Sequence, residues 1–123
     1  MRTGLRMFRR FAKYRIMKIE MNAKLARTAS AFAALGSEQR LSVLRALVRA
    51  GAGGLPVGTL GERAGVAGAT LSHHLRVLAQ AGLVRQERDG RRIVCSVDHG
   101  AVRDLSEWLL AECCADVEGH DHG

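Results

Sequence analysis

The chain has 123 residues, a formal net charge of +7 and three cysteines. This length suits a single domain with a modest core, and the odd number of cysteines is unlike the framework of a secreted disulfide protein. No apolar run is long enough to cross a membrane, and no set of nucleophile, base and orienting residue indicates an enzyme. We therefore expect a cytoplasmic protein with reduced thiols, no membrane association and no catalytic activity.

The positive charge is unevenly distributed along the chain. Residues 1–20 contain seven basic residues and one acidic residue, and residues 21–92 contain eleven basic and four acidic residues. Residues 93–123 contain only one basic residue against seven acidic residues. The first three quarters of the chain therefore have a charge that favours a polyanionic partner, and the end does not.

Residues 1–20 form a basic segment with interleaved aromatic and aliphatic residues. Such a segment is typical of a nucleic-acid arm or of a helix on a membrane surface, and it lacks the apolar stretch of a secretory signal. We expect a poorly ordered extension, which lies outside the native protein if translation starts at Met21. The domain then covers residues 21–116, and residues 117–123 form a polar tail.

The next part of the chain predicts three helices. Asn22 is a plausible N-cap for the first, which ends near Leu35, and Ser37 caps the second, which ends at the glycine-rich residues 51–54. Proline is tolerated in the first turn of a helix, so Pro56 permits a short third helix over residues 57–64.

A fourth helix follows the turn at residues 65–68, because Leu71, Leu75 and Leu78 recur at helical spacing. Gly82 stops it, since glycine adopts the left-handed conformation at helix ends without penalty. The apolar residues then alternate, and an Asp-Gly pair at residues 89–90 indicates a β-hairpin.

A last helix begins near Asp98. The order is α-α-α-α-β-β-α, a mainly helical winged helix-turn-helix with a small β-hairpin. The apolar stripes of the first and last helices are not covered by the helix-turn-helix unit. Pairing them across a two-fold axis predicts a homodimer.

Three segments of the sequence together resemble the ArsR (ArsR/SmtB) family of winged-helix metalloregulatory repressors. LSHHLRVL at residues 71–78, with AGLV at 81–84 and DGR at 89–91, is similar to its recognition helix and wing, and the likeness covers about residues 21–115. The resemblance implies a repressor that binds double-stranded operator DNA and is released by a metal or metalloid.

The polar face of the predicted fourth helix carries groups that can bind DNA. Hydroxyls near the start of a recognition helix reach bases or phosphates, and arginine can donate two hydrogen bonds to guanine. Wing arginines more readily bind phosphate, which gives affinity and salt dependence. His74 is as compatible with packing against the scaffold as with pointing at DNA. The predicted DNA contacts are Thr70, Ser72, His73, Arg76, Arg88, Arg91 and Arg92.

The resemblance also implies an inducer site, and two sites of the family do not fit this sequence. Residues 55–62, which include the helix before the recognition helix, contain no cysteine, so the cysteine-pair site of that helix is absent. Asp98 and His99 match the start of a zinc site in the last helix, but residues 109–114 supply no histidine to complete it.

Cys113 and Cys114 remain as candidate ligands. Two or three thiolates without histidine suit a soft, thiophilic centre. Trivalent arsenic fits, because arsenite takes three sulfurs and methylarsenite takes two, and antimonite is chemically similar. Cys95 alternates with apolar strand residues and is either a core residue or a third sulfur ligand. The predicted function is a repressor released by trivalent arsenic, and the alternative is a winged-helix regulator that responds to another thiophilic metal or to thiol oxidation.

Overall fold

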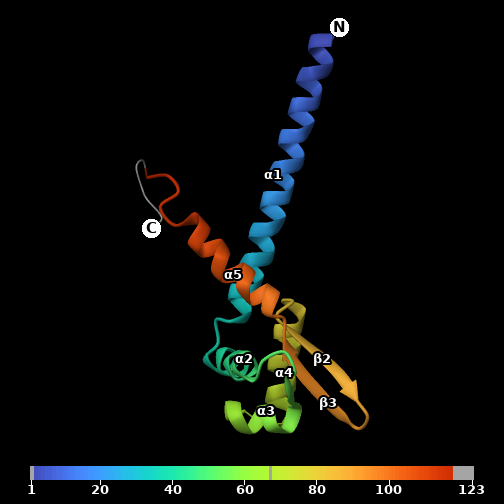
Figure 1. The fold of residues 1–123 in the computed structure, drawn as a ribbon, viewed down its shortest axis with the longest axis vertical. Coiled ribbons are helices and arrows are strands. Elements are labelled where there is room, and N and C mark those ends of the chain that lie inside the picture. The colour runs from blue at the N-terminus through green and yellow to red at the C-terminus, as the bar shows by residue number, and fades with distance from the viewer. Residues whose placement is uncertain (1, 67, 118–123) are drawn as a thin grey trace. The chain divides into compact units, whose positions relative to one another are not determined.

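The structure is a computed structural model that describes residues 2–66 and 68–117. The chain divides into two units, Met1–Ser30 and Ala31–Gly123 (Figure 1). The last residues of the predicted polar tail lie outside the described residues. The elements in chain order are α1 (Arg2–Ala34), α2 (Glu38–Ala50), β1 (Leu55–Pro56), α3 (Val57–Ala64), α4 (Gly68–Gln80), β2 (Val84–Asp89), β3 (Arg92–Val97) and α5 (His99–Glu112).

The first unit is formed by most of α1. This helix already begins at Arg2, so the expectation that it starts at Asn22 is wrong. The reason is that neither glycine nor proline interrupts residues 5–35, and most residues of this stretch are good helix formers. The division into an extension and a domain at residue 20 stays a prediction. The large apolar side chains that this unit exposes are Met7, Phe8, Phe11, Tyr14, Ile16, Met17, Ile19, Met21 and Leu25.

None of the helices in the described parts of the chain is both long and apolar enough for a membrane crossing.

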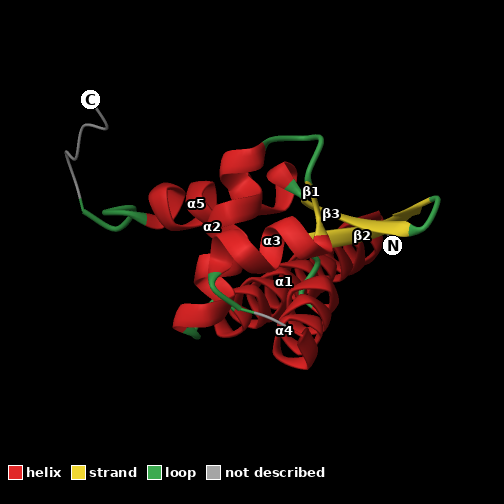
Figure 2. Ribbon diagram, turned by 90° about the horizontal axis from the view of Figure 1, so that it is seen from below, coloured by secondary structure: helices red, strands yellow, loops and turns green. Residues whose placement is uncertain are grey.

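The core of the second unit is built from aliphatic side chains of all its elements except α5. Burial removes this apolar surface from water, which is the main force that holds the elements together. The helices α2, α3 and α4 surround it, and the hairpin of β2 and β3 projects from them (Figure 2). The largest fully buried side chains are Leu47, Leu60, Leu75, Leu78, Leu83, Val43 and Cys95.

The predicted ends of α2 and α3 are confirmed. The hydroxyl of Ser37 accepts a hydrogen bond from the backbone N–H of Arg40 at 3.4 Å, which caps α2. Gly51 ends that helix with φ 82°, a conformation that favours glycine. Pro56 occupies the N-cap position of α3.

The sheet contains one strand that the sequence did not predict. Its order is β1-β3-β2 and both pairings are antiparallel, with Leu55 of β1 opposite Cys95 of β3. β1 is only two residues long, so it has no alternation of its own and exists through its pairing with β3. With this addition, the winged helix-turn-helix fold class is confirmed.

Gly82 ends α4 as the sequence predicts. The N–H of Leu83 donates to the carbonyl of Leu78 at 3.0 Å, and the N–H of Gly82, with φ 77°, donates to that of Ala79 at 3.0 Å. These two hydrogen bonds form a Schellman motif, and the buried side chains of Leu78 and Leu83 provide its apolar contact. The chain therefore leaves the helix directly into the hairpin.

Candidate DNA-binding surface and thiol pair

α4 has one buried and one exposed face. Leu71, Leu75 and Leu78 are buried, and at about 100° per residue they occupy one side of the helix. The four predicted DNA contacts of this helix are all exposed, and most lie on the opposite side. These four predicted contacts are Thr70, Ser72, His73 and Arg76. A polar helix face beside a β-hairpin has the arrangement that places a helix in the major groove and a wing on the backbone.

His74 belongs to the scaffold and not to the exposed face. Its side chain is buried, and Nε2 lies 2.8 Å from Oε1 of Gln39 on α2. Nδ1 has no hydrogen-bond partner among the described residues. Burial, followed by the charge of Arg40 and the proximity of His73, lowers the pKa of His74. The neutral ring therefore joins α4 to α2, and a proton on it disfavours the folded state.

This arrangement predicts an acid-sensitive fold. The unfolded chain binds a proton at His74 near pH 6.5 and the folded chain only at lower pH, so the free energy of unfolding falls as the pH decreases below about 6.5. Each unit of pKa difference changes that free energy by about 1.4 kcal/mol. We expect this loss in urea unfolding of the wild type between pH 7.5 and 5, and a smaller loss in His74→Gln. His99→Gln, at an exposed histidine of α5, is the control, and equal pH dependence of the two variants would contradict the prediction.

The hairpin presents its arginines to solvent. β2 and β3 pair from Val84 opposite Val97 to Asp89 opposite Arg92, and Gly90 with φ 64° begins the two-residue turn. The predicted wing contacts Arg88, Arg91 and Arg92 are exposed. The carboxylate of Asp89 lies 4.0 Å from the guanidinium of Arg92, a contact too exposed to hold that arginine firmly. These guanidiniums are therefore free to bind phosphate.

Asp98 joins α5 to the hairpin. Its carboxylate accepts hydrogen bonds from the backbone N–H of Ala101 at 3.0 Å and from the guanidinium of Arg85 at 2.9 Å. The first of these bonds, together with Arg85, lowers the pKa of Asp98. The sequence shows Asp98 as a helix start but gives no sign that Arg85 binds it. Asp98 therefore contacts both the start of α5 and the first part of β2.

The thiols of Cys113 and Cys114 lie together just beyond the end of α5. Their sulfur atoms are 3.6 Å apart, and both residues are exposed. Adjacent residues of a regular helix diverge, but here Cys113 is the C-cap and Cys114 has φ 60°. A positive φ costs a non-glycine residue about 1–2 kcal/mol. This conformation lets both sulfurs approach one point.

Cys95 is separated from this pair. It is fully buried in β3, and burial raises the pKa of its thiol. A thiol must lose its proton to bind a metal or metalloid, so this environment disfavours the ligand role and suits the interpretation as a core residue. Within the described residues, no three His, Cys, Asp or Glu side chains are placed to hold one metal ion. The role of Cys95 as a third ligand stays a prediction.

Known proteins share this sequence pattern. A helix-turn-helix domain family matches residues 35–87. The HTH-type transcriptional regulator NmtR of Mycobacterium tuberculosis is 43% identical over 85 residues, which are 69% of this chain and 68% of NmtR. The uncharacterized HTH-type transcriptional regulator YceK of Bacillus subtilis is 36% identical over 63 residues, which are 51% of this chain and 62% of YceK.

Solved structures share the fold. An ArsR-like transcriptional regulator from Rhodococcus sp. RHA1 superposes with a TM-score of 0.62 at 27% identity, over 72% of this chain and 81% of that one. AntR, an antimony-specific transcriptional repressor, superposes with a TM-score of 0.57 at 30% identity, over 72% of this chain and 79% of AntR.

The winged helix-turn-helix fold, with a polar recognition helix and an arginine-bearing wing, defines a DNA-binding transcriptional regulator. The sequence identity to NmtR, which is itself a transcriptional regulator, covers two thirds of both chains. The chain belongs to the ArsR family of transcriptional regulators.

Mutations in the recognition helix and in the wing are expected to weaken DNA binding in different ways. Arg91→Ala/Arg92→Ala should weaken binding to all duplexes and flatten the salt dependence, because phosphate contacts release counterions whatever the bases. Arg76→Ala should lose about 1–3 kcal/mol of preference for the operator over random DNA if Arg76 binds guanine. The measurement is fluorescence anisotropy with an operator selected from random duplexes. Equal losses on both duplexes for Arg76→Ala would refute base reading by this residue.

Proposed function

We propose that the protein is a dimeric transcriptional repressor that leaves its operator when trivalent arsenic binds the thiolates of Cys113 and Cys114. The observation that carries this proposal is the 3.6 Å separation of the two sulfur atoms at the exposed end of α5. Two sulfurs that each bind the same soft atom at about 2.3 Å lie at most about 4.6 Å apart. The pair is therefore within the spacing at which both sulfurs can bind one soft atom.

The number of thiols distinguishes the arsenic species. Arsenite takes three sulfurs, and methylarsenite needs two because its methyl group occupies the third position. Cys113 and Cys114 supply two thiols to one centre, and Cys95 is buried elsewhere in the fold. This pairing favours methylarsenite over arsenite as the inducer. AntR, with a similar fold, is named as antimony-specific, which agrees with a soft trivalent element as the ligand.

The apolar side chains of α5 support a dimer. No residue of this helix is buried, and Leu109 and Leu110 are 52% and 70% exposed. Val102 and Leu105 of this helix pack against the core of the same chain, so the apolar surface left for a partner is that of Leu109 and Leu110, whose burial would stabilise a dimer. A structural neighbour from Mycobacterium bovis is described as a homodimeric winged helix-turn-helix domain. In such a dimer, two recognition helices reach successive major grooves.

The coupling between the thiols and the recognition helix runs through α5. An inducer releases DNA only if it binds the DNA-incompetent geometry more tightly than the competent one. Asp98 at the start of α5 contacts Arg85 of the hairpin, and the thiol pair lies at the other end of the same helix. A ligand that reorganises the end of α5 thus changes how the dimer presents its two wings.

The test is a titration of the DNA-bound protein followed by fluorescence anisotropy. We expect methylarsenite to release the operator at a lower concentration than arsenite, and zinc to have no effect in the same range. Cadmium and peroxide probe the alternative of another thiophilic metal or thiol oxidation. Release by peroxide or cadmium with no response to either arsenic compound would overturn the proposal.

A further inference from the structure

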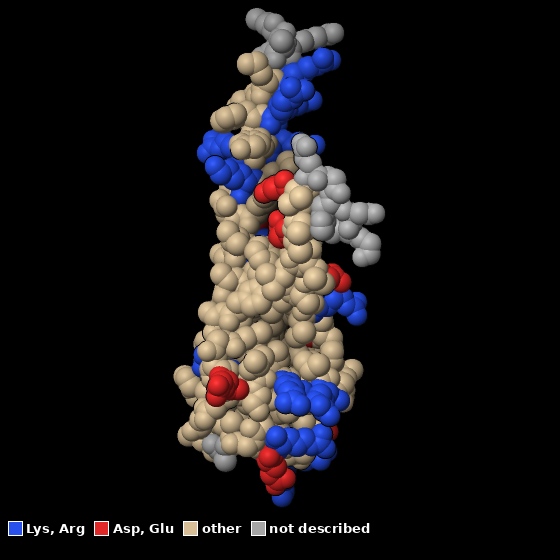
Figure 3. All heavy atoms as spheres, turned by 90° about the vertical axis from the view of Figure 1, so that its left-hand side faces the viewer, with Lys and Arg blue, Asp and Glu red and all other residues tan. Residues whose placement is uncertain are grey.

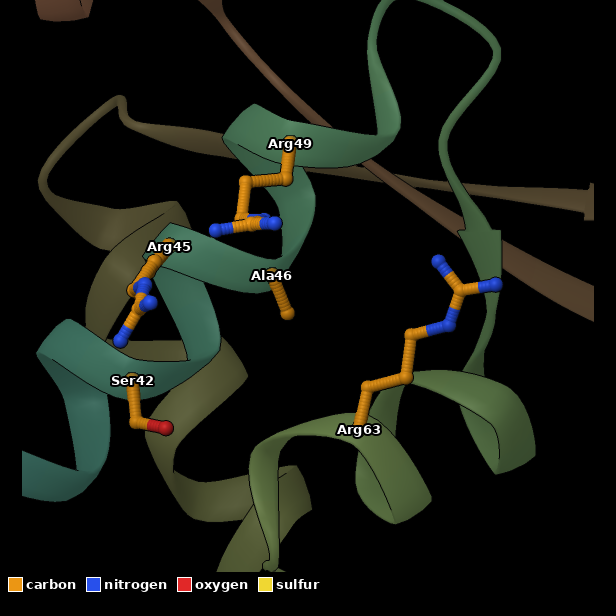
Figure 4. A pocket seen from close by; sticks show the side chains of 5 residues that line it. All are labelled: Ser42, Arg45, Ala46, Arg49 and Arg63. Atoms are coloured by element: carbon orange, nitrogen blue, oxygen red, sulfur yellow. The ribbon is translucent and has the colours of Figure 1, made fainter.

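A second basic site lies away from the recognition helix, in a cleft between α2 and α3. The cleft has a volume of about 340 Å³ and is lined by Ser42, Arg45, Ala46, Arg49 and Arg63. Figure 4 shows Arg45 and Arg49 on α2 and Arg63 rising from α3 on the other side of the opening. The short side chain of Ala46 faces the opening between them and leaves it unfilled.

The two walls of the cleft are joined by a hydrogen bond at its base. The hydroxyl of Ser42 on α2 donates to the backbone carbonyl of Ala64 on α3 at 3.2 Å. Arg63 directly precedes Ala64, so this bond fixes the wall that carries its guanidinium. On α2, Arg45 and Arg49 are four residues apart and therefore lie on one side of the helix, one turn from each other. All three side chains line the cleft, with Arg45 and Arg49 on the α2 side and Arg63 on the α3 side (Figure 4).

Among the described residues, no carboxylate forms an ion pair with the arginines of the cleft. No carboxylate lines it, and the two ion pairs found among the described residues, Arg85–Asp98 and Arg92–Asp89, both lie in the hairpin region. Positive charges that are neighbours on a helix repel one another unless an anion balances them. Guanidinium groups present planar pairs of N–H donors that match a phosphate. An anion that matches these donors therefore has the chemistry of a phosphate group.

The position of the cleft favours the DNA backbone as the source of this phosphate. α3 is the first helix of the helix-turn-helix unit, which crosses the sugar-phosphate backbone while the second helix enters the groove. All three arginines are exposed and the cleft is open, which suits a polymer that passes over it. Figure 3 shows basic side chains near the lower end of the winged-helix unit, with acidic side chains beside some of them.

We propose that Arg45, Arg49 and Arg63 form an anchor for a backbone phosphate of DNA, separate from the recognition helix and the wing. The anchor carries no sequence information, because it binds a group that every duplex presents. It acts in the DNA-binding step and does not depend on the inducer. Its test needs no arsenic, so it can fail while the proposed switch stands, and the reverse also holds.

The test is the salt dependence of binding to a random 30-base-pair duplex. We expect Arg49→Gln/Arg63→Gln to reduce the slope of log K against log salt concentration by about 0.9, the contribution of one neutralised phosphate. Arg49→Lys/Arg63→Lys retains the charge and should keep a slope close to that of the wild type. Arg103→Gln, an exposed arginine of α5, is the control for a general loss of charge and should leave the slope unchanged.

Circular dichroism melting verifies that each variant is folded, and the single variants Arg49→Gln and Arg63→Gln decide the outcome if the double variant melts early. A slope in Arg49→Gln/Arg63→Gln equal to that of Arg103→Gln would overturn the anchor. A second arm adds pyrophosphate to the free protein. If pyrophosphate raises the melting temperature of the wild type but not of the variant while the DNA slope is unchanged, the cleft holds a small phosphate compound and the assignment to DNA is wrong.

Discussion

Replacing Gly54 with alanine is expected to destabilise the winged-helix unit by about 3 kcal/mol or more. Gly54 has φ 68°, which an alanine tolerates poorly. A β-carbon there would overlap the carbonyl oxygen of Cys95 and lie 2.9 Å from the carbonyl carbon of that residue. These atoms belong to the backbone of β3 and cannot move without breaking the pairing of Leu55 with Cys95. The strand β1 should therefore separate from the sheet.

Gly53→Ala is the matched control. A β-carbon at Gly53 meets no atom within 4 Å, so this variant should stay within about 1 kcal/mol of the wild type. The measurement is the midpoint of urea unfolding, with the slope checked for two-state behaviour. Similar midpoints for Gly54→Ala and Gly53→Ala would show that the close approach of Gly54 to β3 does not limit stability.

Cys113→Ser and Cys114→Ser are expected to bind the operator as the wild type does but to lose release by methylarsenite. Both side chains are exposed, so serine should leave the fold unchanged. Moving a regulator from almost fully bound to almost fully free requires a preference of about 10⁴-fold for the released state. Two sulfur–arsenic bonds can supply this preference, and a single remaining thiolate forms only one of them. We therefore expect no release at arsenic concentrations that free the wild type from DNA.

The measurement is anisotropy of labelled operator during titration with each arsenic compound. Cys95→Ser is the informative comparison. If Cys95 only packs in the core, the variant loses stability but keeps both responses, as the buried position of this thiol suggests. If Cys95 is a third ligand, its arsenite response falls much more than its methylarsenite response. Release of Cys113→Ser at the wild-type arsenic concentration would place the inducer site elsewhere.

Local patterns in the sequence were sufficient for the helix-turn-helix unit and the wing. The leucine spacing of α4, the capping hydroxyl of Ser37 and the glycine at position 82 each act within one turn of the chain. Gly90 likewise specifies the hairpin by local backbone geometry, because its φ of 64° begins the two-residue turn between Asp89 and Arg92. These features depend on neighbours in sequence, so they can be predicted without knowledge of the fold.

The beginning of α1 cannot be predicted from a local capping pattern alone. Asn22 can cap a helix, but no helix breaker directly precedes it, and the helix runs through that position. A capping residue marks a helix start only where the preceding residues cannot continue the helix. The same sequence is compatible with both alternatives, so the pattern did not decide between them.

The sequence by itself determined the order of the elements, the polar face of α4, the arginines of the wing and the presence of two adjacent thiols. Only the tertiary structure decided which of these residues meet. His74 bonds to Gln39 over 35 positions and Arg85 to Asp98 over 13, and β1 exists only because β3 lies beside it. The arginine cleft joins residues of two helices, and the thiol pair depends on the chain turn beyond α5. Such contacts follow from how the elements pack, and no local pattern of residues encodes that packing.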